Sequence, residues 1–494
     1  MLCISTVKHA FSPRTSIGCL SLENSEIEKL KKKYLRPPNQ MGLARLKTFV
    51  LENSPAWLVV ALMRRFITKS DYQSKRESVA FFRRANMAYG AHRQRRSVRL
   101  LRVAFGLLGA ELSKDYSRLI IGATNQTQRD ASRRSALSGE ILEATKALPI
   151  GRTDATGWYQ LSRGLFSVGY FRAAWVAREN SIDRTIDEGK SNWRSSTSFK
   201  RCVEAYLERR DLSTAEVLLS KASNYLTEIN ICDLSDYLNL LLHKDKLPFL
   251  DPNSSNFEAE EFFGKLIYGK SVALVGPGRP AGLYGDEIDS ADTVVRIKYV
   301  GPEHLPSREF HGSRCDINYF GDSELNALRQ NLSVHEWLAY FSNVKMFLTS
   351  RTVSGKSGSF LTLNMYSTGS PYRTNSYAGV RTLFTLCRYK PTKLKLYGLN
   401  FYADNIDYSD ENQRFLEKSA KNLGHSLFDQ QGISQQKSYY RSRGFYNHDV
   451  VSNFCFAQNL YKAGLFEIEP YGASILALTP YQYVERLEEM LGDW

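Results

Sequence analysis

The feature of this chain that most constrains its fold is a change of hydrophobic period near residue 258. Beyond it, short β-branched or apolar runs alternate with longer helical patterns. The runs are SVALVG, TVVRIK, CDINYF, KMFLTS, KLKLYG and LFEIEP, and the helical patterns are ELNALRQNL, GVRTLFTLCRYK, NQRFLEKSAKNL and VVSNFCFAQNLYKAG. Strands that alternate with helices need crossover connections, which favour a mostly parallel sheet covered on both faces. Residues 259–494 are therefore predicted to form an α/β domain of nucleotide-binding type.

The chain before this domain is predicted to be helical. Residues 1–150 form a basic helical region, and residues 151–248 carry a weak repeat typical of helical hairpins. The two copies are offset by 42 residues and match at Leu165, Gly169 and Ala173 with Leu207, Asp211 and Ala215. A plain helical bundle is an equal alternative for this second region. Residues 246–258, KLPFLDPNSSNFE, have the composition of a linker.

The excess of positive over negative charge is confined to the first fifth of the chain. Residues 1–110 hold 21 Lys and Arg against 6 Asp and Glu, whereas the other residues hold 45 of each, and the net charge is +15. A basic block can face an anionic membrane surface, an acidic partner or only solvent. The apolar run at 54–66, SPAWLVVALMRRF, is too short to span a bilayer but long enough to lie in its interface. We expect no nucleic-acid partner, because no zinc, RNP or helix-turn-helix signature occurs.

Cysteine usage and the first residues point to a reducing compartment. The seven cysteines are scattered without a CxxC pair, and VKHAFSPRTSIG interrupts any apolar stretch of a secretion signal. The sequence therefore predicts reduced thiols in a cytoplasmic protein, which leaves peripheral binding at the inner face of a membrane open.

The glycine-rich loop after the first strand is the first candidate site. Gly276, Gly278 and Gly282 follow VALV, where missing side chains let backbone N–H groups approach a phosphate. The spacing GxGxxxG is one residue longer than the dinucleotide fingerprint, and the next strand leads into Arg296 and Lys298 instead of a ribose-binding carboxylate. An NADP-dependent oxidoreductase and a purely structural turn remain alternatives at this point.

The residues around this loop resemble a known family. VGPGRPAGLYGDEIDSADTVVRIK resembles the large sialylmotif of the animal-type sialyltransferases, glycosyltransferase family 29, and FHGSRCDI follows it at the expected place. The residues in register are Val275, Gly276, Gly285, Glu287, Ile288, Asp289, Ser290, Asp292, Val294 and Arg296. Residues 375–402 look like the small sialylmotif of that family, 438–443 (SYYRSR) stand at its short aromatic motif, and 445–454 (FYNHDVVSNF) resemble its final HDxxxE-type motif.

The resemblance implies a Rossmann-like, variant GT-A-type catalytic domain, here preceded by an all-α region of helical repeats or a bundle. It implies transfer of a keto-sugar acid, with inversion, from a CMP-activated donor to a hydroxyl of a glycan or glycolipid acceptor. The CMP-sugar is the donor substrate, and no cofactor is expected. Pro277, Lys298, Ser438 and Ser452 replace residues of the family pattern. Because three of these changes fall on donor contacts, a CMP-Kdo-type transferase is an alternative.

The same resemblance implies a set of site residues. His448 is the expected base for the acceptor hydroxyl, since an imidazole titrates near neutrality. The expected contacts of the donor's sugar and phosphate are Gly276, Pro277, Gly278, Arg296, Lys298, Ser376, Gly379, Lys437, Ser438 and Tyr439.

The leaving phosphate would be bound by backbone N–H groups around 276–278 and 376–379 and by the Tyr439 hydroxyl. Lys437 or Ser438 would replace the phosphate-binding histidine that the family has at position 438. Arg296 and Lys298 would meet the sugar carboxylate or line a basic pocket. Because a single phosphate leaves and no DxD pattern at ligand spacing occurs, the reaction is predicted to need no metal.

Overall fold

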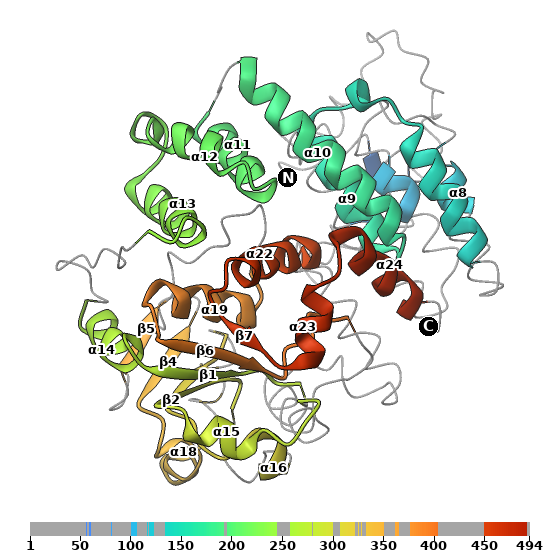
Figure 1. Cartoon of the computed structure of the whole chain (residues 1–494). Helices are drawn as coiled ribbons and strands as arrows, with labels where there is room; N and C mark the ends of the chain where they lie inside the picture. Colours follow the sequence, from blue (N-terminus) through green and yellow to red (C-terminus); the bar gives the residue numbers. More distant parts are fainter. Residues whose placement is uncertain are drawn as a thin grey trace, which may run out of the picture. The chain divides into compact units, whose positions relative to one another are not determined.

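The computed structural model describes residues 56, 59–60, 81, 100–105, 116, 118–122, 134–191, 195–244, 257–278, 280–299, 307–321, 325, 328, 332–349, 361–364, 376–403 and 449–491. The chain divides into two compact units, Met1–Leu62 and Met63–Trp494. Every element labelled here belongs to the second unit (Figure 1). Most of the basic region lies outside the described residues, so its predicted membrane contact stays a prediction. Among the described helices, none combines the length and the apolar character needed to cross a membrane.

A seven-stranded sheet confirms the predicted α/β class. The strands are β1 (Ser271–Val275), β2 (Thr293–Ile297), β3 (Ile317–Tyr319), β4 (Met346–Thr349), β5 (Leu361–Asn364), β6 (Lys393–Tyr397) and β7 (Glu467–Ile468). Their order is β5-β4-β3-β2-β1-β6-β7, and all neighbours pair in parallel. From β1 the chain builds the sheet outward to β5 and then returns to the other side of β1, as in doubly wound folds. The order therefore reverses between β1 and β6.

The composition of the strands explains why they are central. In β2 all five residues, TVVRI, are buried, and in β1 only the first residue is partly exposed. Strands covered on both faces read as continuous β-branched and apolar runs, which is the pattern seen here. β5, with the sequence LTLN, was not among the predicted strands.

Helices cover both faces of the sheet. They are α14 (Phe257–Ile267), α15 (Gly285–Ser290), α16 (Arg308–His311), α18 (Val334–Phe341), α19 (Ala378–Arg388), α22 (Val450–Lys462), α23 (Pro470–Leu476) and α24 (Pro480–Leu491). Figure 1 shows α15, α16 and α18 on one side and α19, α22 and α23 on the other. On the first side, Ile288 of α15 packs against Val275, Val294 and Tyr397. The helix α22 that the sequence predicted is confirmed.

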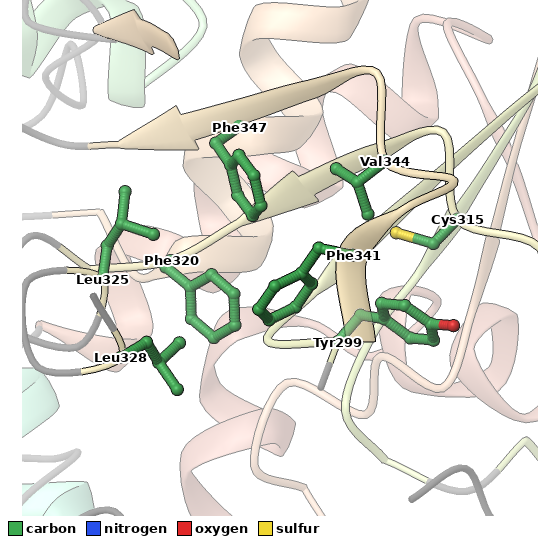
Figure 2. Packing of buried hydrophobic residues seen from close by; sticks show 8 residues of the cluster. All are labelled: Tyr299, Cys315, Phe320, Leu325, Leu328, Phe341, Val344 and Phe347. Carbon is green, nitrogen blue, oxygen red and sulfur yellow. The ribbon is translucent and has the colours of Figure 1, made fainter. Parts of the chain in front are cut away.

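An aromatic cluster fixes α18 against β3 and β4 (Figure 2). Phe341 contacts the rings of Phe320 and Phe347 at centroid distances of 6.2 and 5.5 Å, both with interplanar angles of 83°. Such edge-to-face pairs favour one arrangement of the rings over others of equal area. Cys315 is buried in the same cluster, and burial raises the pKa of its thiol.

The region before the sheet consists of helices in the described residues. They are α8 (Arg134–Lys146), α9 (Ala155–Ser167), α10 (Phe171–Ser191), α11 (Ser196–Glu208), α12 (Leu212–Leu219) and α13 (Glu228–Leu241), with one-turn 3₁₀ helices η4 (Ile150–Arg152) and η5 (Ala222–Asn224).

Two successive helical hairpins, α9–α10 and α11–α12, account for the predicted repeat. The helices of the second hairpin begin 41 residues after those of the first, at 196 against 155 and at 212 against 171. The predicted offset of 42 was therefore wrong by one residue. The turn residue with positive φ is Gly169 in the first hairpin and Arg210 in the second. The expected match had paired Gly169 with Asp211, which is instead the N-cap of α12.

Ion pairs join the helical region to elements of the α/β region. Arg388 of α19 pairs with Asp236 of α13 at 2.5 Å. Glu488 of α24 accepts hydrogen bonds from the backbone N–H and the Nε of Arg172 in α10, both at 2.8 Å. The aromatic rings of Tyr237 (α13) and Phe456 (α22) stack at 4.5 Å. The helices on the two sides of the predicted linker thus form one packed unit.

Candidate functional site

The candidate site lies at the carboxyl edge of the sheet, where the strand order reverses. In open α/β sheets this edge is where ligands bind. Here the loop after β1 and the loop after β6 meet directly. The N–H of Gly276 donates to the Tyr397 carbonyl at 2.8 Å, and the N–H of Gly278 donates to the Gly398 carbonyl at 3.2 Å. The two loops therefore form one continuous backbone surface.

Three glycines make this contact sterically feasible. A Cβ on Gly276 would come within 2.4 Å of the Gly398 carbonyl oxygen, and one on Gly278 within 2.8 Å. Gly398 has a φ of +62°, and a Cβ there would lie 2.3 Å from the Gly278 carbonyl oxygen. The glycines that sequence reading assigned to a phosphate thus first serve a close approach of two backbones.

A buried glutamate ties the same two loops together. Glu469, 3% exposed, stands between β7 and α23. Its Oε1 accepts the N–H of Gly398 at 2.6 Å, and its Oε2 accepts the N–H of Ala281 at 2.8 Å. On the other side of the loop, Nε2 of buried His311 lies 3.2 Å from the Gly278 carbonyl oxygen. A carbonyl oxygen only accepts, so Nε2 is the donor in this hydrogen bond.

This hydrogen bonding revises the expected phosphate cradle. The N–H groups of Gly276, Gly278 and Ala281 all donate to protein acceptors. Pro277 and Pro280 have no N–H. At these five positions a ligand could contact carbonyl oxygens and carbon atoms, but no main-chain N–H is available to donate a hydrogen bond to it. The expectation that the N–H groups around Gly276 to Gly278 hold the leaving phosphate does not fit this conformation.

Arg296 is a framework residue in this structure. It is 3% exposed, and its Nε and Nη2 donate to the carbonyls of Arg314 and His311 at 2.5 and 2.6 Å. Burial lowers its pKa from the ordinary arginine value. Its guanidinium is therefore committed to the segment before β3, contrary to the expected contact with a sugar carboxylate. Lys298, two residues on, is half-buried with a φ of +61°.

The start of α19 converges on the same edge. Gly379 would place a Cβ 3.0 Å from Cδ2 of Leu399, which is also within 2.6 Å of the Cβ position of Gly276. Ile297, the last residue of β2, lies 3.6 Å from the Gly379 position through its Cδ1. Ser376, at the turn before α19, is buried. Two predicted residues from distant segments, Gly276 and Gly379, thus both lie against Leu399.

The first turn of α22 reaches the start of α19. Asp449 is the N-cap of α22, and its Oδ1 accepts the N–H of Ser452 at 3.0 Å. Oδ1 of Asn453 accepts the N–H of Tyr377 at 3.1 Å across 76 residues of sequence. The predicted base, His448, directly precedes Asp449 in the chain but lies outside the described residues. The same holds for the other predicted contacts in this part of the chain, Lys437, Ser438 and Tyr439.

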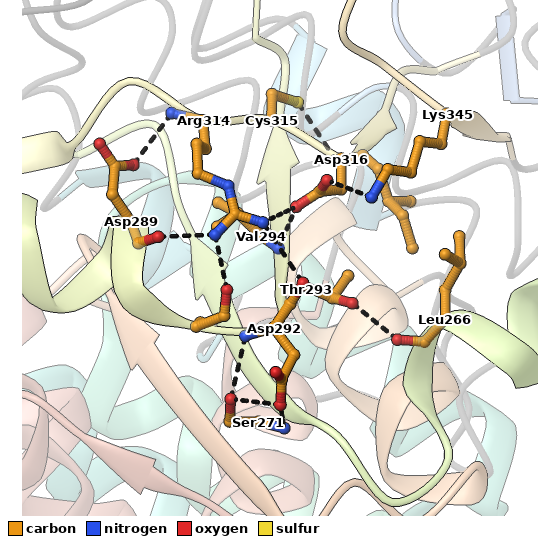
Figure 3. Close-up of polar contacts among 12 residues, drawn as sticks. Leu266, Ser271, Asp289, Asp292, Thr293, Val294, Arg314, Cys315, Asp316 and Lys345 are labelled. Carbon is orange, nitrogen blue, oxygen red and sulfur yellow. Dashed lines mark hydrogen bonds and ion pairs between the residues drawn. The ribbon is translucent and has the colours of Figure 1, made fainter.

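The acidic residues of the large motif lie elsewhere, toward the amino edge of the sheet (Figure 3). Asp289 accepts hydrogen bonds from the backbone N–H groups of Ser313 and Arg314 at 2.9 Å. Asp292 accepts from the N–H and the hydroxyl of Ser271, both at 2.8 Å. Asp316 accepts the N–H of Val294 at 2.9 Å. These carboxylates join α15 and the segments that lead into the strands.

The thiols and the acidic groups form no metal-binding cluster in the described part of the chain. Cys202, Cys232, Cys315, Cys387 and Cys455 are free thiols. Burial raises the pKa of Cys387 to about 12, which leaves its thiol protonated near neutrality. Among the described residues no group of three or more His, Cys, Asp and Glu side chains is arranged to hold a metal ion.

Sequence reading missed Glu469, Gly398 and Asn453. Glu469 had a usable signal, because it stands in EIEPYG before Pro470. A proline at the first helical position marks a helix start, and here that start follows a strand. A polar residue at this point belongs to the carboxyl edge of a parallel sheet. The pairing of Asn453 with Tyr377 depends on tertiary structure and had no local signal.

Comparison of the chain with protein-family models, with curated proteins and with solved structures found no match. No relative therefore assigns a role to any residue. The likeness to sialyltransferases rests on the motif residues of this sequence alone.

Proposed function

We propose that this protein is a sialyltransferase-like, inverting glycosyltransferase with a Rossmann-like, variant GT-A-type catalytic domain. It would transfer a keto-sugar acid from a CMP-activated donor to a hydroxyl of a glycan or glycolipid. The proposal rests on the motif resemblance together with the doubly wound strand order.

The observation that supports it most is the hydrogen bond from the Tyr377 N–H to Asn453. It joins the first turns of α19 and α22, which carry the small-motif turn and the end of the HDxxxE-type motif. An inverting transfer places the leaving phosphate and the acceptor's base on opposite faces of one sugar carbon, so the segments that carry them must lie close together. Contact between these two helix starts is compatible with such an arrangement.

The arrangement of the loops suggests which residues would bind each part of the donor. The phosphate charge would lie at the start of α19, at Ser376 and Gly379, where helix N–H groups and the helix dipole favour an anion. The fused loops at Gly276 to Gly278 and Gly398 would contact the nucleoside through carbonyl oxygens and carbon surface. Lys298 would add positive charge nearby, and His448 would take the acceptor proton. Stabilisation of the departing phosphate would be the largest catalytic contribution.

Two alternatives stay distinct. An NADP-dependent oxidoreductase needs free N–H groups in the glycine loop, and those of Gly276, Gly278 and Ala281 are already bonded. A CMP-Kdo-type transferase would use the same edge with a different sugar, so only the donor separates it from the leading proposal.

The test uses the full chain. CMP should raise its melting temperature and NADPH should not, and CMP should be released from CMP-Neu5Ac or, for the alternative donor, from CMP-Kdo. The His448→Ala variant should lose about 10²- to 10⁴-fold in kcat for CMP release while it still binds CMP. His335→Ala, at an exposed position of α18, is the matched control and should behave as wild type. Release of CMP from neither donor, without stabilisation by CMP, would refute the proposal.

A further inference from the structure

The helical region contributes one buried cation to the start of α22. Arg178 of α10 is 2% exposed. It forms an ion pair with Glu208 at the end of α11, its Nε lies 3.5 Å from Oδ2 of Asp449, and its Nη2 donates to the Ser452 hydroxyl at 2.6 Å. One guanidinium thus connects two helices of the hairpin region to the N-cap and the first turn of α22, 271 residues away.

The contacts continue from Arg178 to the candidate site. Asp449 and Ser452, which Arg178 holds, are themselves linked, because Asp449 caps the Ser452 N–H. The Nδ2 of Asn453 donates to the Asp449 carbonyl at 2.8 Å, which leaves Oδ1 of Asn453 to accept the Tyr377 N–H. Every step in this path is a hydrogen bond or ion pair between buried groups. These contacts therefore connect a side chain of α10 to Tyr377, the N-cap of α19.

Charge explains why this position needs arginine. Asp449 is buried and Glu208 is partly buried, and one guanidinium forms ion pairs with both carboxylates. Burial acts to raise the pKa of Asp449, but Arg178 and Arg163 outweigh it and hold that pKa below the ordinary value. Removing the arginine would take away the guanidinium that pairs with both carboxylates, which is strongly unfavourable for groups so little exposed to water. The capping carboxylate of α22 would then have to move or take up a proton.

A small cavity beside Arg178 makes a substitution feasible. It has a volume of about 20 Å³ and is lined by residues that include Arg178, Arg201, Glu204, Glu208 and Ser452. This is room for about one water molecule. A shorter side chain at position 178 could therefore be solvated without repacking of the helices.

We propose that Arg178 is a positioning residue of the candidate site, through which the hairpin region fixes the first turns of α22 and α19. The assignment of this site to a CMP-sugar rests on the proposed function, but the positioning role does not. A purely local ion pair would stabilise the protein without affecting α19.

The first test needs no ligand. Hydrogen–deuterium exchange should be at least tenfold faster in the Arg178→Gln variant for peptides that cover 376–380 and 449–453. Exchange in β3 and β4 should not change, which separates a local effect from global loosening. Arg178→Lys should show a smaller change, because it keeps the charge. The matched control is Arg209→Gln, since Arg209 pairs with Glu179 and Asp183 of the same α10 but is a third exposed.

The second test measures CMP release by the same variants. Arg178→Gln should lower kcat about 10- to 100-fold and raise the KM of the donor several-fold, whereas Arg209→Gln should stay within twofold of wild type. If Arg178→Gln does not fold, Ser452→Ala removes one contact of Arg178 and should raise exchange at 376–380 to a lesser degree.

The two measurements separate the two ideas. Unchanged exchange at 376–380 in the folded Arg178→Gln variant, or in Ser452→Ala where that variant does not fold, would overturn the positioning role whatever the enzyme does. Absence of CMP release by the wild-type protein would count against the proposed function and leave the exchange result standing.

Discussion

The two edges of the sheet use the recognisable residues of this sequence in opposite ways. At the amino edge, the carboxylates of Asp289, Asp292 and Asp316 accept hydrogen bonds from backbone and side-chain groups of the protein (Figure 3). At the carboxyl edge, glycine loops and helix starts converge around Leu399. The specific part of the large motif is thus mainly framework, whereas the less distinctive glycines lie at the candidate site.

This contrast shows how a motif and a site can be separated within one stretch of sequence. α15 packs along the segment 308–314, which includes α16. Gly285, at the start of α15, would place a Cβ 1.9 Å from the Arg308 carbonyl oxygen, and Asp289, near its end, accepts the N–H groups of Ser313 and Arg314. A residue in register with a family motif therefore need not contact a ligand.

The strongest effect is expected at the carboxyl edge. Gly398→Ala places a methyl group against the Gly278 carbonyl in a left-handed conformation and should lower the free energy of unfolding by about 3 kcal/mol. It should also abolish stabilisation by CMP, because the two loops must separate. Gly464→Ala is the matched control, since its φ is +66° but nothing lies within 4 Å of the new methyl group. It should cost only about 1 kcal/mol. Urea unfolding measures both, and equal losses would contradict the contact between the loops.

The next effect tests the amino edge. Asp289→Asn replaces an acceptor with a partial donor beside two N–H groups and should cost about 2 kcal/mol in urea unfolding. The KM for the donor should not change. Glu287→Gln, at the exposed ion pair with Lys395, is the control and should change stability little. A raised KM in Asp289→Asn would place this residue in the site and remove the contrast between the edges.

The pH dependence of the same residue gives a second measurement. Burial acts to raise the pKa of Asp289, but the hydrogen bonds from Arg314 and Ser313 outweigh it and lower that pKa. The stabilisation is therefore present above the unfolded-state value of about 3.9 and is lost as the pH falls through the folded-state value. The stability difference between wild type and Asp289→Asn should shrink below about pH 4.

A weaker effect is expected for Glu469→Gln, which tests whether Glu469 positions the site loops or only stabilises the fold. Glu469→Gln leaves one of two backbone N–H groups facing an amide N–H and should cost about 1.5 kcal/mol. Because those N–H groups belong to the site loops, the KM for the donor should rise about tenfold. Glu467→Gln, two residues earlier and exposed in its pair with Lys393, should change neither quantity. An unchanged KM in Glu469→Gln would assign Glu469 to the framework.

The weakest effect is expected for Asp292→Asn. Asp292 lies at the exposed end of the amino edge, where its carboxylate accepts hydrogen bonds from Ser271. Neither the melting temperature nor the affinity for CMP should change measurably. A clear loss of CMP affinity would contradict a framework role for the acidic part of the motif.

Much of the fold followed from local patterns. Six of the seven strands stood out as short β-branched or apolar runs between helical patterns. The run is nearly continuous in β1 and β2, which are covered on both faces. β5 did not stand out, since LTLN is short, half polar and stands in a stretch rich in Ser and Gly. The hairpin offset was wrong by one residue because a positive φ at Arg210 gives no local signal of the kind that glycine gives at Gly169.

Local patterns predicted the alternation of strands and helices, and helical hairpins as an equal alternative to a bundle, because periodicity and turn chemistry are local properties. The segments at the carboxyl edge were indicated by the glycine loop together with the family resemblance. The roles of the polar groups, in contrast, emerged only from the folded arrangement. In the folded protein Arg296 donates to the His311 and Arg314 carbonyls, and the N–H groups of the glycine loop donate to protein acceptors. The fold also brings Arg178 to the start of α22. Hydrogen-bond partners far apart in the chain are chosen by packing, which no local pattern records.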